Sequence, residues 1–408
     1  MKCRHCNAEI GLSLIDLGGA PPSNAYLSKH SLGQIEKYFP LHVLVCEVCW
    51  LVQTEDYIGV EELFDRDYAY FSSVSSSWLN HAEEFVGEVV NRFRLDSSSL
   101  VIEVASNDGY LLQFVQNRGI PCLGIEPTAS TAMEARKKGL QVLEDFFGTQ
   151  LANQLLSKDQ KADLIIANNV LAHVPHINDF VAGFSVLLKP NGIASFEFPH
   201  ILELIRYVQF DTIYHEHFSY LSLTAVEKIF NANGLKIFDV KKISTHGGSL
   251  RIFAQRKDLG QQPISSSVAD ILNQEKNAGI QTTLFYSNFQ TKANFIKDNL
   301  LTFLINAKKE NKKVIAYGAA AKGNTLLNYA GIKPDLLPIV IDKNIEKQGK
   351  FMPGSHISIR DESLIEEIKP DFILILPWNI ADEIIDQLHY VRNWGAQFVR
   401  AVPYLEIL

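Results

Sequence analysis

The chain has 408 residues, which is enough for two or three domains that each bury their own core. Its 38 lysines and arginines against 46 aspartates and glutamates give a net charge of −8 without long runs of either sign, which argues against a nucleic-acid-binding protein. The sequence contains no run of about 18 apolar residues, the length needed to cross a membrane, and the first residues do not have the pattern of a signal peptide. We expect a cytoplasmic protein that binds neither nucleic acid nor membrane.

Four of the five cysteines form two pairs near the amino terminus, Cys3 with Cys6 and Cys46 with Cys49. Two Cys-x-x-Cys turns can supply four thiolates that bind one Zn²⁺ tetrahedrally. Reduced or redox-active dithiols are the weaker alternative, because two matched pairs bracket one small module. Four cysteines leave no open coordination position, so the zinc should be structural. We predict a zinc-binding domain over residues 1–66.

The segment that follows, residues 61–78, is rich in tyrosine and serine. It lies just ahead of the first strand of the next domain, where a lid over a ligand would be placed. Tyr68, Tyr70 and Ser73 are therefore candidate substrate contacts, although an ordinary aromatic connector would have the same composition. Residues 80–93 have the spacing of an amphipathic helix.

Residues 101–115 predict a strand, a tight turn and a helix. Apolar residues around Glu103 form a short buried strand, small residues follow, and residues 111–115 begin a helix. In an open α/β sheet the end of such a strand and the start of such a helix border one crevice, where nucleotide-like ligands bind. This stretch is the centre of the predicted ligand site.

The next predicted strand, residues 123–126, ends in Glu126, whose carboxylate could accept both hydroxyls of a ribose. The glycines of a dinucleotide-binding turn are missing, because Ala105 and Asn107 stand in their places. A pyrophosphate against this turn is therefore a poor fit. An adenosine without phosphates fits better, namely S-adenosylmethionine (SAM), although any doubly wound domain contains strand-turn-helix units.

Further strands complete a doubly wound α/β domain. A third strand end places Asp145 beside Phe146, which suits the amino group and face of an adenine. The remaining predicted strands are residues 162–169, 192–199, 235–240 and 250–255. Five strands that alternate with helices, followed by an antiparallel pair, are the layout of a class I SAM-dependent methyltransferase. We predict this Rossmann-like core over residues 67–257.

The densest cluster of reactive side chains is Tyr214-His215-Glu216-His217. It follows the fifth strand and should lie over the carboxyl edge of the sheet, facing the methyl donor. A metal site on His215 and His217, which share one face at a period of two, would need further ligands that the sequence does not identify. Histidines packed under the aromatic residues are a second alternative. General acid and base chemistry is favoured, since an imidazole oriented by a neighbouring carboxylate is poised near neutral pH.

The last part of the chain predicts a helical connector over residues 258–305 and a second Rossmann-like α/β domain over 306–408. Strand 313–318 leads into the small-residue turn 319–323, which holds Lys322, and a helix follows. Backbone N–H groups at a helix start together with a lysine form an anion site. The alternative is that this second Rossmann-like domain is a scaffold that binds no ligand of its own. Further strands are predicted at 339–342 and 372–377, and Lys347 and Lys350 add positive charge.

Together these features resemble the sugar C-methyltransferases of deoxysugar biosynthesis, which methylate C-3 of a nucleotide-linked 4-keto-6-deoxyhexose. The resemblance covers nearly the whole chain: the four-cysteine module, the SAM sheet, the Tyr-His-Glu-His loop and the Gly-Ala-Ala-Ala-Lys-Gly turn. It implies zinc on the four cysteines and SAM as methyl donor. It also implies SAM contacts from Glu103, Ala105, Asn107, Gly109, Tyr110, Glu126, Pro127, Asp145, Phe146, Asn168, Asn169 and His173.

On the same resemblance His217 would be the base, supported by Tyr214, Glu216 and His215. A family tyrosine ahead of the SAM domain matches Tyr70 best, with Tyr68 as the rival. The tail domain would help to hold the nucleotide diphosphate. The implied substrate contacts are Tyr68, Tyr70, Ser73, Tyr214, His246, Gly318, Ala319, Lys322, Gly323, Asn324 and Asp342.

The implied chemistry explains why these residue types are needed. A C–H next to the C-4 ketone can be removed by a positioned base because the enolate spreads charge onto oxygen. A tyrosine or a histidine N–H would bond that oxygen, and C-3 would attack the sulfonium methyl. An O- or N-methyltransferase and a non-catalytic zinc-ribbon protein are the alternatives. The nucleotide (dTDP, GDP or CDP) and the oligomeric state stay open, and a monomer is expected.

Overall fold

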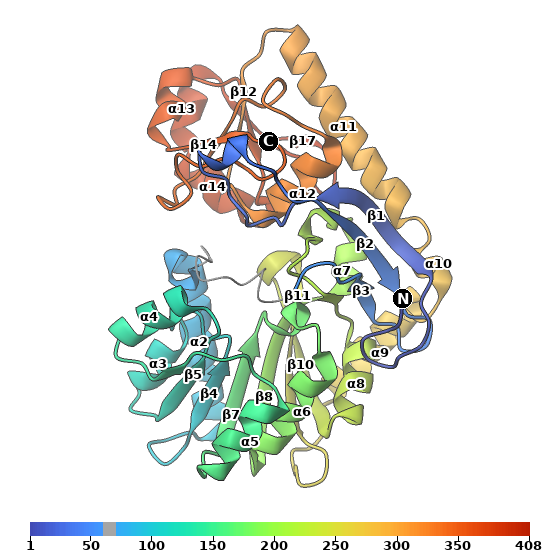
Figure 1. The fold of residues 1–408 in the computed structure, drawn as a ribbon, viewed down its shortest axis with the longest axis vertical. Coiled ribbons are helices and arrows are strands. Elements are labelled where there is room, and N and C mark those ends of the chain that lie inside the picture. The colour runs from blue at the N-terminus through green and yellow to red at the C-terminus, as the bar shows by residue number, and fades with distance from the viewer. Residues whose placement is uncertain (60–70) are drawn as a thin grey trace.

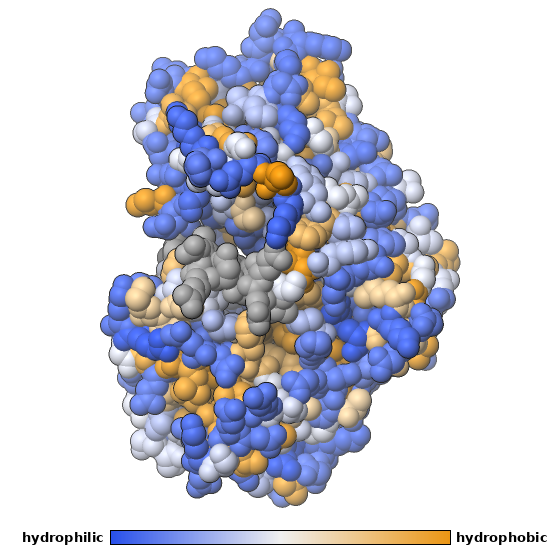
Figure 2. Space-filling model, in the orientation of Figure 1, coloured by the Kyte–Doolittle hydropathy of each residue, from blue (hydrophilic) through white to orange (hydrophobic). Residues whose placement is uncertain are grey.

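The computed structural model describes residues 1–59 and 71–408, and it contains three sheets in three domains (Figure 1). Tyr68 and Tyr70 lie outside the described residues. No helix in the described part of the chain is long and apolar enough to span a membrane. On the face shown in Figure 2, hydrophilic side chains predominate and apolar ones lie between them.

The amino-terminal sheet is antiparallel and has the order β1-β2-β3-β9. Its strands are β1 (Leu12–Ala20), β2 (Phe39–Val45), β3 (Val52–Thr54) and β9 (Ser219–Tyr220). The fourth strand belongs to the chain segment that directly follows His217. The sheet of the zinc module is therefore completed by a piece of the methyltransferase domain.

The central sheet has the order β10-β11-β8-β7-β4-β5-β6, and β11 runs antiparallel to both neighbours while the five strands from β8 to β6 are parallel. This order confirms the predicted class I methyltransferase fold. The strands are β4 (Val101–Val104), β5 (Cys122–Ile125), β6 (Val142–Leu143), β7 (Ala162–Asn168), β8 (Leu188–Pro199), β10 (Leu235–Ile243) and β11 (Ser249–Arg256).

Helices cover both faces of the central sheet (Figure 1). One face buries apolar residues of α2 (Ser76–Phe93), α3 (Leu112–Gln116) and α4 (Ala129–Lys137). The other face buries those of α5 (Thr149–Ser157), α6 (Ile177–Leu187) and α8 (Leu223–Ala232). Because both faces are covered, the parallel strands are apolar on both sides, as the sequence predicted for β4.

The carboxyl-terminal sheet has the order β14-β13-β12-β15-β16-β17 and is parallel except for β17. Its strands are β12 (Val314–Tyr317), β13 (Ile339–Ile341), β14 (Ser358–Arg360), β15 (Phe372–Ile375), β16 (Gln397–Arg400) and β17 (Glu406–Ile407). The helices of this region are α9 (Ser266–Ala278), α10 (Thr283–Tyr286), α11 (Phe289–Lys309), α12 (Ala321–Ala330), α13 (Ser363–Ile368) and α14 (Ala381–Gln387). Helix α12 begins earlier than the sequence predicted, so Lys322 lies on the first turn of a helix and not in the preceding loop.

One core joins the three domains. It contains Leu14 and Ile15 of β1, Leu300 of α11 and Leu326 of α12, together with residues of α7 (Ile201–Arg206). Most of the predicted connector is thus packed into the body of the protein.

Residues 21–38, between β1 and β2, lie against the carboxyl-terminal domain, where Figure 1 shows them in dark blue. The Tyr26 hydroxyl donates to the Ala319 carbonyl at 2.6 Å, and Leu27 pairs with Phe351. Farther along, the Gly354 N–H donates to Glu36 at 2.7 Å. We call residues 21–38 the strap.

Gly109 is required by the close packing behind the turn that follows β4. Its φ is 76°, and an added Cβ would lie 2.2 Å from Leu140 Cδ1. Gly119 offers a matched control, because its φ is 70° but no atom lies within 4 Å of the added Cβ. Gly119→Ala should cost about 1–2 kcal/mol for the left-handed backbone.

Gly109→Ala should lower the free energy of unfolding by a further ~1–3 kcal/mol, because the added methyl group overpacks the site. Thermal unfolding of the two variants side by side measures the difference. Equal shifts of the melting temperature would contradict this packing argument.

Candidate active site between the three domains

A cavity of about 1000 Å³ lies where the three domains meet. Its walls come from the carboxyl ends of the central strands, the loop around His217, the strap and the start of α12. The predicted site residues that line it are Ala105, Asn107, Tyr110, Glu126, Pro127, Asp145, Phe146, Asn168, Asn169, His173, Tyr214, His217, His246 and Lys322.

The turn after β4 has positive φ angles at the two positions where a dinucleotide-binding turn would have glycine. Ala105 has a φ of 58° and Asn107 a φ of 49°. An alanine in this region costs about 1–2 kcal/mol, and such strain concentrates at ligand sites. Asn169 and His246, which also line the cavity, have φ values of 54° and 53°. Four strained residues thus face one volume.

Glu126 fixes this turn and also faces the cavity. Its carboxylate accepts the N–H of Asn107 at 2.9 Å and the N–H of Thr128 at 3.0 Å. Burial raises the pKa of Glu126, while these N–H bonds oppose the shift. A carboxylate has about four lone-pair sites, so hydroxyls of a ribose can still be accepted here.

Two predicted cofactor residues, Glu103 and Gly109, do not line the cavity. Glu103 is buried in β4, and burial together with the charge of Glu126 raises its pKa well above the ordinary carboxyl value. These residues support the turn from behind. Cavity residues that the sequence did not single out include Trp78, Thr128, Phe147, Gln150, His176 and Asp179.

Trp78 is the missed residue with a visible signal, since a large aromatic side chain stands in the first turn of an amphipathic helix. Its ring stacks on His81 with centroids 4.9 Å apart and on Tyr110 at 6.0 Å. It also meets His246 at 5.1 Å. These rings form an aromatic wall beside the turn that follows β4.

The imidazole of His217 is held in its neutral form. Its Nδ1 donates to the Thr212 carbonyl at 2.8 Å, which leaves the lone pair on Nε2. The ring lies 4.0 Å from Tyr214 and 4.7 Å from His173 between centroids. Burial, and then His173, lower the pKa of His217 well below the usual value. We expected a carboxylate to orient this imidazole, and the structure shows a backbone carbonyl in that role.

The neighbours of His217 in the sequence lie outside the cavity. Glu216 is buried, and its carboxylate accepts from Asn24 of the strap at 3.1 Å. The backbone carbonyl of Glu216 accepts from His173 Nδ1 at 2.7 Å. His215 points toward the zinc module, with Nε2 3.3 Å from the carbonyl of Phe39 and 3.2 Å from that of Pro40. Neither residue is placed to contact a ligand in the cavity.

The zinc module holds the loop that carries His217. Val52 and Gln53 of β3 pair with Tyr220 and Ser219 of β9. The Thr54 hydroxyl donates to the His217 carbonyl at 3.2 Å. Because Gln53 also donates to Cys3 Sγ at 3.3 Å, one strand connects the cysteine cluster to the loop.

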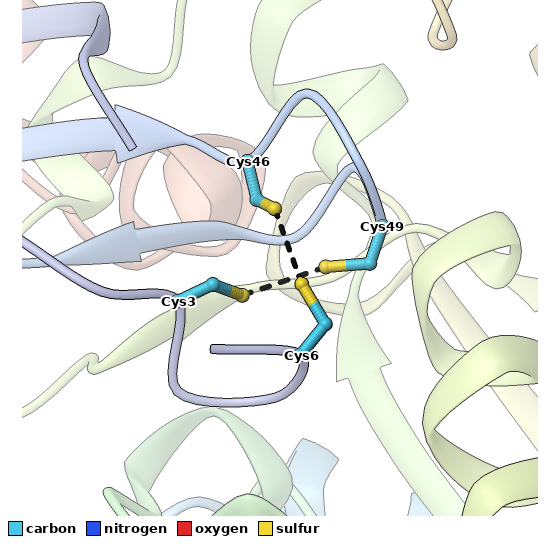
Figure 3. Close-up of side chains that lie close together, drawn as sticks. All are labelled: Cys3, Cys6, Cys46 and Cys49. Carbon is cyan, nitrogen blue, oxygen red and sulfur yellow. Dashed lines mark hydrogen bonds between the residues drawn. The ribbon is translucent and has the colours of Figure 1, made fainter. Parts of the chain in front are cut away.

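The four cysteines have the geometry of a zinc site (Figure 3). Their Sγ atoms all lie within 4.8 Å of one another, and Cys3–Cys49 and Cys6–Cys46 are each 3.5 Å apart. Tetrahedral zinc with Zn–S bonds of about 2.3 Å sets sulfur atoms about 3.8 Å apart, so the cluster fits the ion. Within the described residues His215 and His217 belong to no such cluster.

The start of α12 forms the opposite wall. Ala320, Ala321, Lys322 and Lys347 face the cavity. The predicted contacts Gly318, Ala319, Gly323, Asn324 and Asp342 are not among the residues that line it. They shape the turn instead, since Asp342 accepts the Ala319 N–H at 2.7 Å and Asn324 donates to the Ser23 carbonyl at 2.6 Å.

Ser73, another predicted substrate contact, also lies outside the cavity. Its N–H donates to Asp108 at 3.2 Å, and its hydroxyl accepts from Lys138 at 2.8 Å. Asn24, Lys347, Pro377 and Asn379 line the cavity without having been singled out as contacts. Of these four residues, only Lys347 was marked by a sequence pattern, the positively charged stretch 347–350.

The chain is 31% identical to the C-methyltransferase NovU of Streptomyces niveus over 402 residues, which are 98% of this chain and 95% of that relative. The chain belongs to the C-methyltransferase family. Family models match a zinc binding domain at residues 3–64, a methyltransferase domain at 78–240 and a C-methyltransferase C-terminal domain at 244–403. This C-methyltransferase uses SAM and carries a zinc-binding domain.

Two further similarities cover only parts of this C-methyltransferase. A ubiquinone biosynthesis O-methyltransferase of Pasteurella multocida is 29% identical over 158 residues, 34% of this chain and 65% of that relative. The magnesium protoporphyrin IX methyltransferase of Synechocystis, solved with SAM, has a TM-score of 0.35 and 17% identity, with 45% of this chain and 82% of that chain covered.

Removal of zinc should abolish methyl transfer while SAM still binds. Without the ion β3 loses the support of Cys3, the loop shifts, and a misplacement of about 1 Å can cost about 10²-fold in rate. The SAM-facing residues belong to the central sheet and keep their places. Titration calorimetry with SAM and a methyl-transfer assay, each on chelated and zinc-reloaded protein, check this. Full activity in zinc-free protein would contradict the role of the module.

Proposed function

We propose that this C-methyltransferase transfers a methyl group to C-3 of a nucleotide-linked 4-keto-6-deoxyhexose in the biosynthesis of a branched deoxysugar. The observation that carries the proposal is the composition of one cavity. It holds the turn after β4, the neutral imidazole of His217 and the cationic start of α12. These three parts of the cavity suit a methyl donor, a ketosugar and a diphosphate, respectively.

Carbon methylation needs a carbon nucleophile, and His217 is placed to create one. Nε2 would take the proton from C-3, and the electron pair would move onto the C-4 carbonyl oxygen to give an enolate. Bound SAM supplies an electrophilic methyl group. Tyr214, whose ring lies 4.0 Å from that of His217, would help to position the sugar.

The cofactor side of the cavity is assigned to the central sheet. Glu126 would accept ribose hydroxyls, and Asp145 with Phe146 would meet the adenine. Asn168, Asn169 and Trp78 line the same cavity as residues 214–217, which we call the reactive loop, so they would enclose the methyl-bearing end. Excluding water there strengthens every polar contact with the substrate.

The diphosphate is assigned to the start of α12. The first N–H groups of a helix and its dipole attract an anion, and Lys347 lines the same wall. The Lys347 ammonium lies 4.0 Å from Asp342 and donates to the Ala319 carbonyl at 2.7 Å, so it is already oriented. This wall could hold a diphosphate whatever base the nucleotide carries.

The direct test is a panel of dTDP-, GDP- and CDP-linked 4-keto-6-deoxy sugars incubated with SAM. One member should gain a single methyl group by mass spectrometry, and proton NMR should show that the C-3 proton has been lost. The matching 4-hydroxy sugars are the controls and should not react, because they cannot form an enolate. A methyl group found on oxygen or nitrogen would refute the proposal.

His217→Gln should lower kcat by about 10²- to 10⁴-fold, because the base is removed. SAM affinity should be unchanged, since the cofactor wall is intact. His215→Gln is the matched control two residues away, and its smaller loss would reflect only a looser contact with the zinc module. Steady-state kinetics and calorimetry measure both. Equal losses in the two variants would remove His217 from the role of base.

The acidic limb of kcat/KM should lie below pH 6.5, the usual imidazole pKa, because burial and then His173 lower the pKa of His217. The neutral imidazole is the active form. Activity is therefore present above the lowered pKa and is lost as the pH falls through it. Initial rates from about pH 5 to 8 measure the limb. A limb at or above 6.5 would mean that His217 is not buried as described.

A further inference from the structure

The two lysines that line the cavity from the carboxyl-terminal domain have different surroundings. Lys347 contacts its own side of the cavity: the Ala319 carbonyl at 2.7 Å, Asp342 at 4.0 Å and the face of the Tyr26 ring at 5.1 Å. All three belong to the turn before α12, its neighbouring strand end or the strap. Lys347 is thus part of the wall assigned to the diphosphate.

Lys322 contacts the part of the carboxyl-terminal domain that borders the methyltransferase domain. Its ammonium donates to Asn379 Oδ1 at 2.5 Å and lies 4.5 Å from the centre of the Trp378 ring. Trp378 in turn donates from Nε1 to Asp211 at 2.6 Å. A Cβ added to Gly247 would lie 2.5 Å from the same indole. Asp211 precedes the reactive loop and Gly247 follows His246. Trp378 therefore contacts the methyltransferase domain near both histidines while its ring holds Lys322.

The charge of Lys322 reaches the reactive histidines. Burial is the main cause of the lowered pKa values of His217 and His246. The Lys322 charge adds to both, directly after burial for His246 and as the smallest contribution, after His173 and His246, for His217. It also opposes the effect of burial on Asp211. An ammonium that acts on both imidazoles and lines the same cavity lies beside the place where a ketosugar would react.

The chemistry needs a cation at that place. His217 is a weak base because its pKa is lowered, and a C–H next to a ketone is a weak acid. Proton transfer between them becomes favourable only if the new oxyanion is stabilised by a fixed donor. Lys322 is fixed by Asn379 and Trp378, so it would need no reorganisation during the reaction.

We propose that Lys322 is a catalytic residue that donates a hydrogen bond to the C-4 carbonyl oxygen and stabilises the enolate. The proposal rests on the proposed function. The C-3–H bond breaks, the proton moves to His217 Nε2, and the electron pair forms a C-3=C-4 bond with the charge on oxygen beside Lys322. The C-3=C-4 pair then forms the bond to the methyl carbon, the sulfur–methyl bond breaks with its pair left on sulfur in the departing thioether, and an oxygen lone pair re-forms the carbonyl. His217 later releases its proton to solvent. Lys322 keeps its protons throughout.

The test compares Lys322→Met with Lys347→Met on the ketosugar that the wild-type enzyme methylates. Lys322→Met should lower kcat by about 10²- to 10³-fold, the usual effect of losing one oxyanion donor. C-3–H cleavage should then limit the rate, so the deuterium isotope effect on kcat with C-3-deuterated substrate should rise. Lys347→Met should raise KM and leave both kcat and its isotope effect near the wild-type values.

SAM binding by calorimetry and the melting temperature establish that both variants are folded. If Lys322→Met is not folded, Lys322→Arg replaces it, and this variant should retain an intermediate kcat because the charge is kept but displaced. Raised KM with unchanged kcat and isotope effect in the Lys322 variant would overturn the inference and leave Lys322 as a diphosphate ligand. A wild-type enzyme that methylates no 4-keto sugar at carbon would instead overturn the proposed function itself.

Discussion

The pairing of β9 with β3 is the interaction on which the arrangement of the candidate site depends. It joins two residues that follow the reactive loop to the sheet of a different domain, and that sheet ends at the cysteine cluster. A loop is ordinarily among the least stable parts of a fold. Here backbone hydrogen bonds on one side and the strap residue Asn24 on the other hold it in place. A zinc ion on the four cysteines would therefore act on the candidate site through position alone.

The electrostatics of the cavity follow from burial. Burial lowers the pKa values of His173 and His246 to about 4 and that of His217 well below its usual value, so all three imidazoles are neutral at neutral pH. The positive charge comes from the carboxyl-terminal domain, and the carboxylates of Glu126 and Asp145 come from the central sheet. His217 and the two lysines thus belong to different domains, and they line one cavity only because the domains are packed together.

The sequence predicted the parts of this protein that repeat in period or spacing. The alternation of strands and helices in the central domain and the four cysteines were predictable because alternating elements and paired Cys-x-x-Cys turns are local patterns. The contact of Asn24 with Glu216 was not readable, since it joins loop residues far apart in the chain. Strand β9 was missed because two residues are too short to show any period. His215 was predicted to be catalytic because it belongs to the same motif as His217. Neighbouring residues of a motif can point in different directions, and the His215 ring points to the zinc module.

The strap has a consequence for how the enzyme is made. Residues 21–38 are synthesised well before their partners, since Tyr26 lies 293 residues ahead of Ala319 and Glu36 lies 318 residues ahead of Gly354. Domains generally fold in order from the amino terminus during synthesis. The central sheet can therefore form on a growing chain, whereas the strap must wait for its partner. A growing chain that has not reached residue 354 can hold the central sheet, but it lacks contacts that keep the strap in place at the cavity.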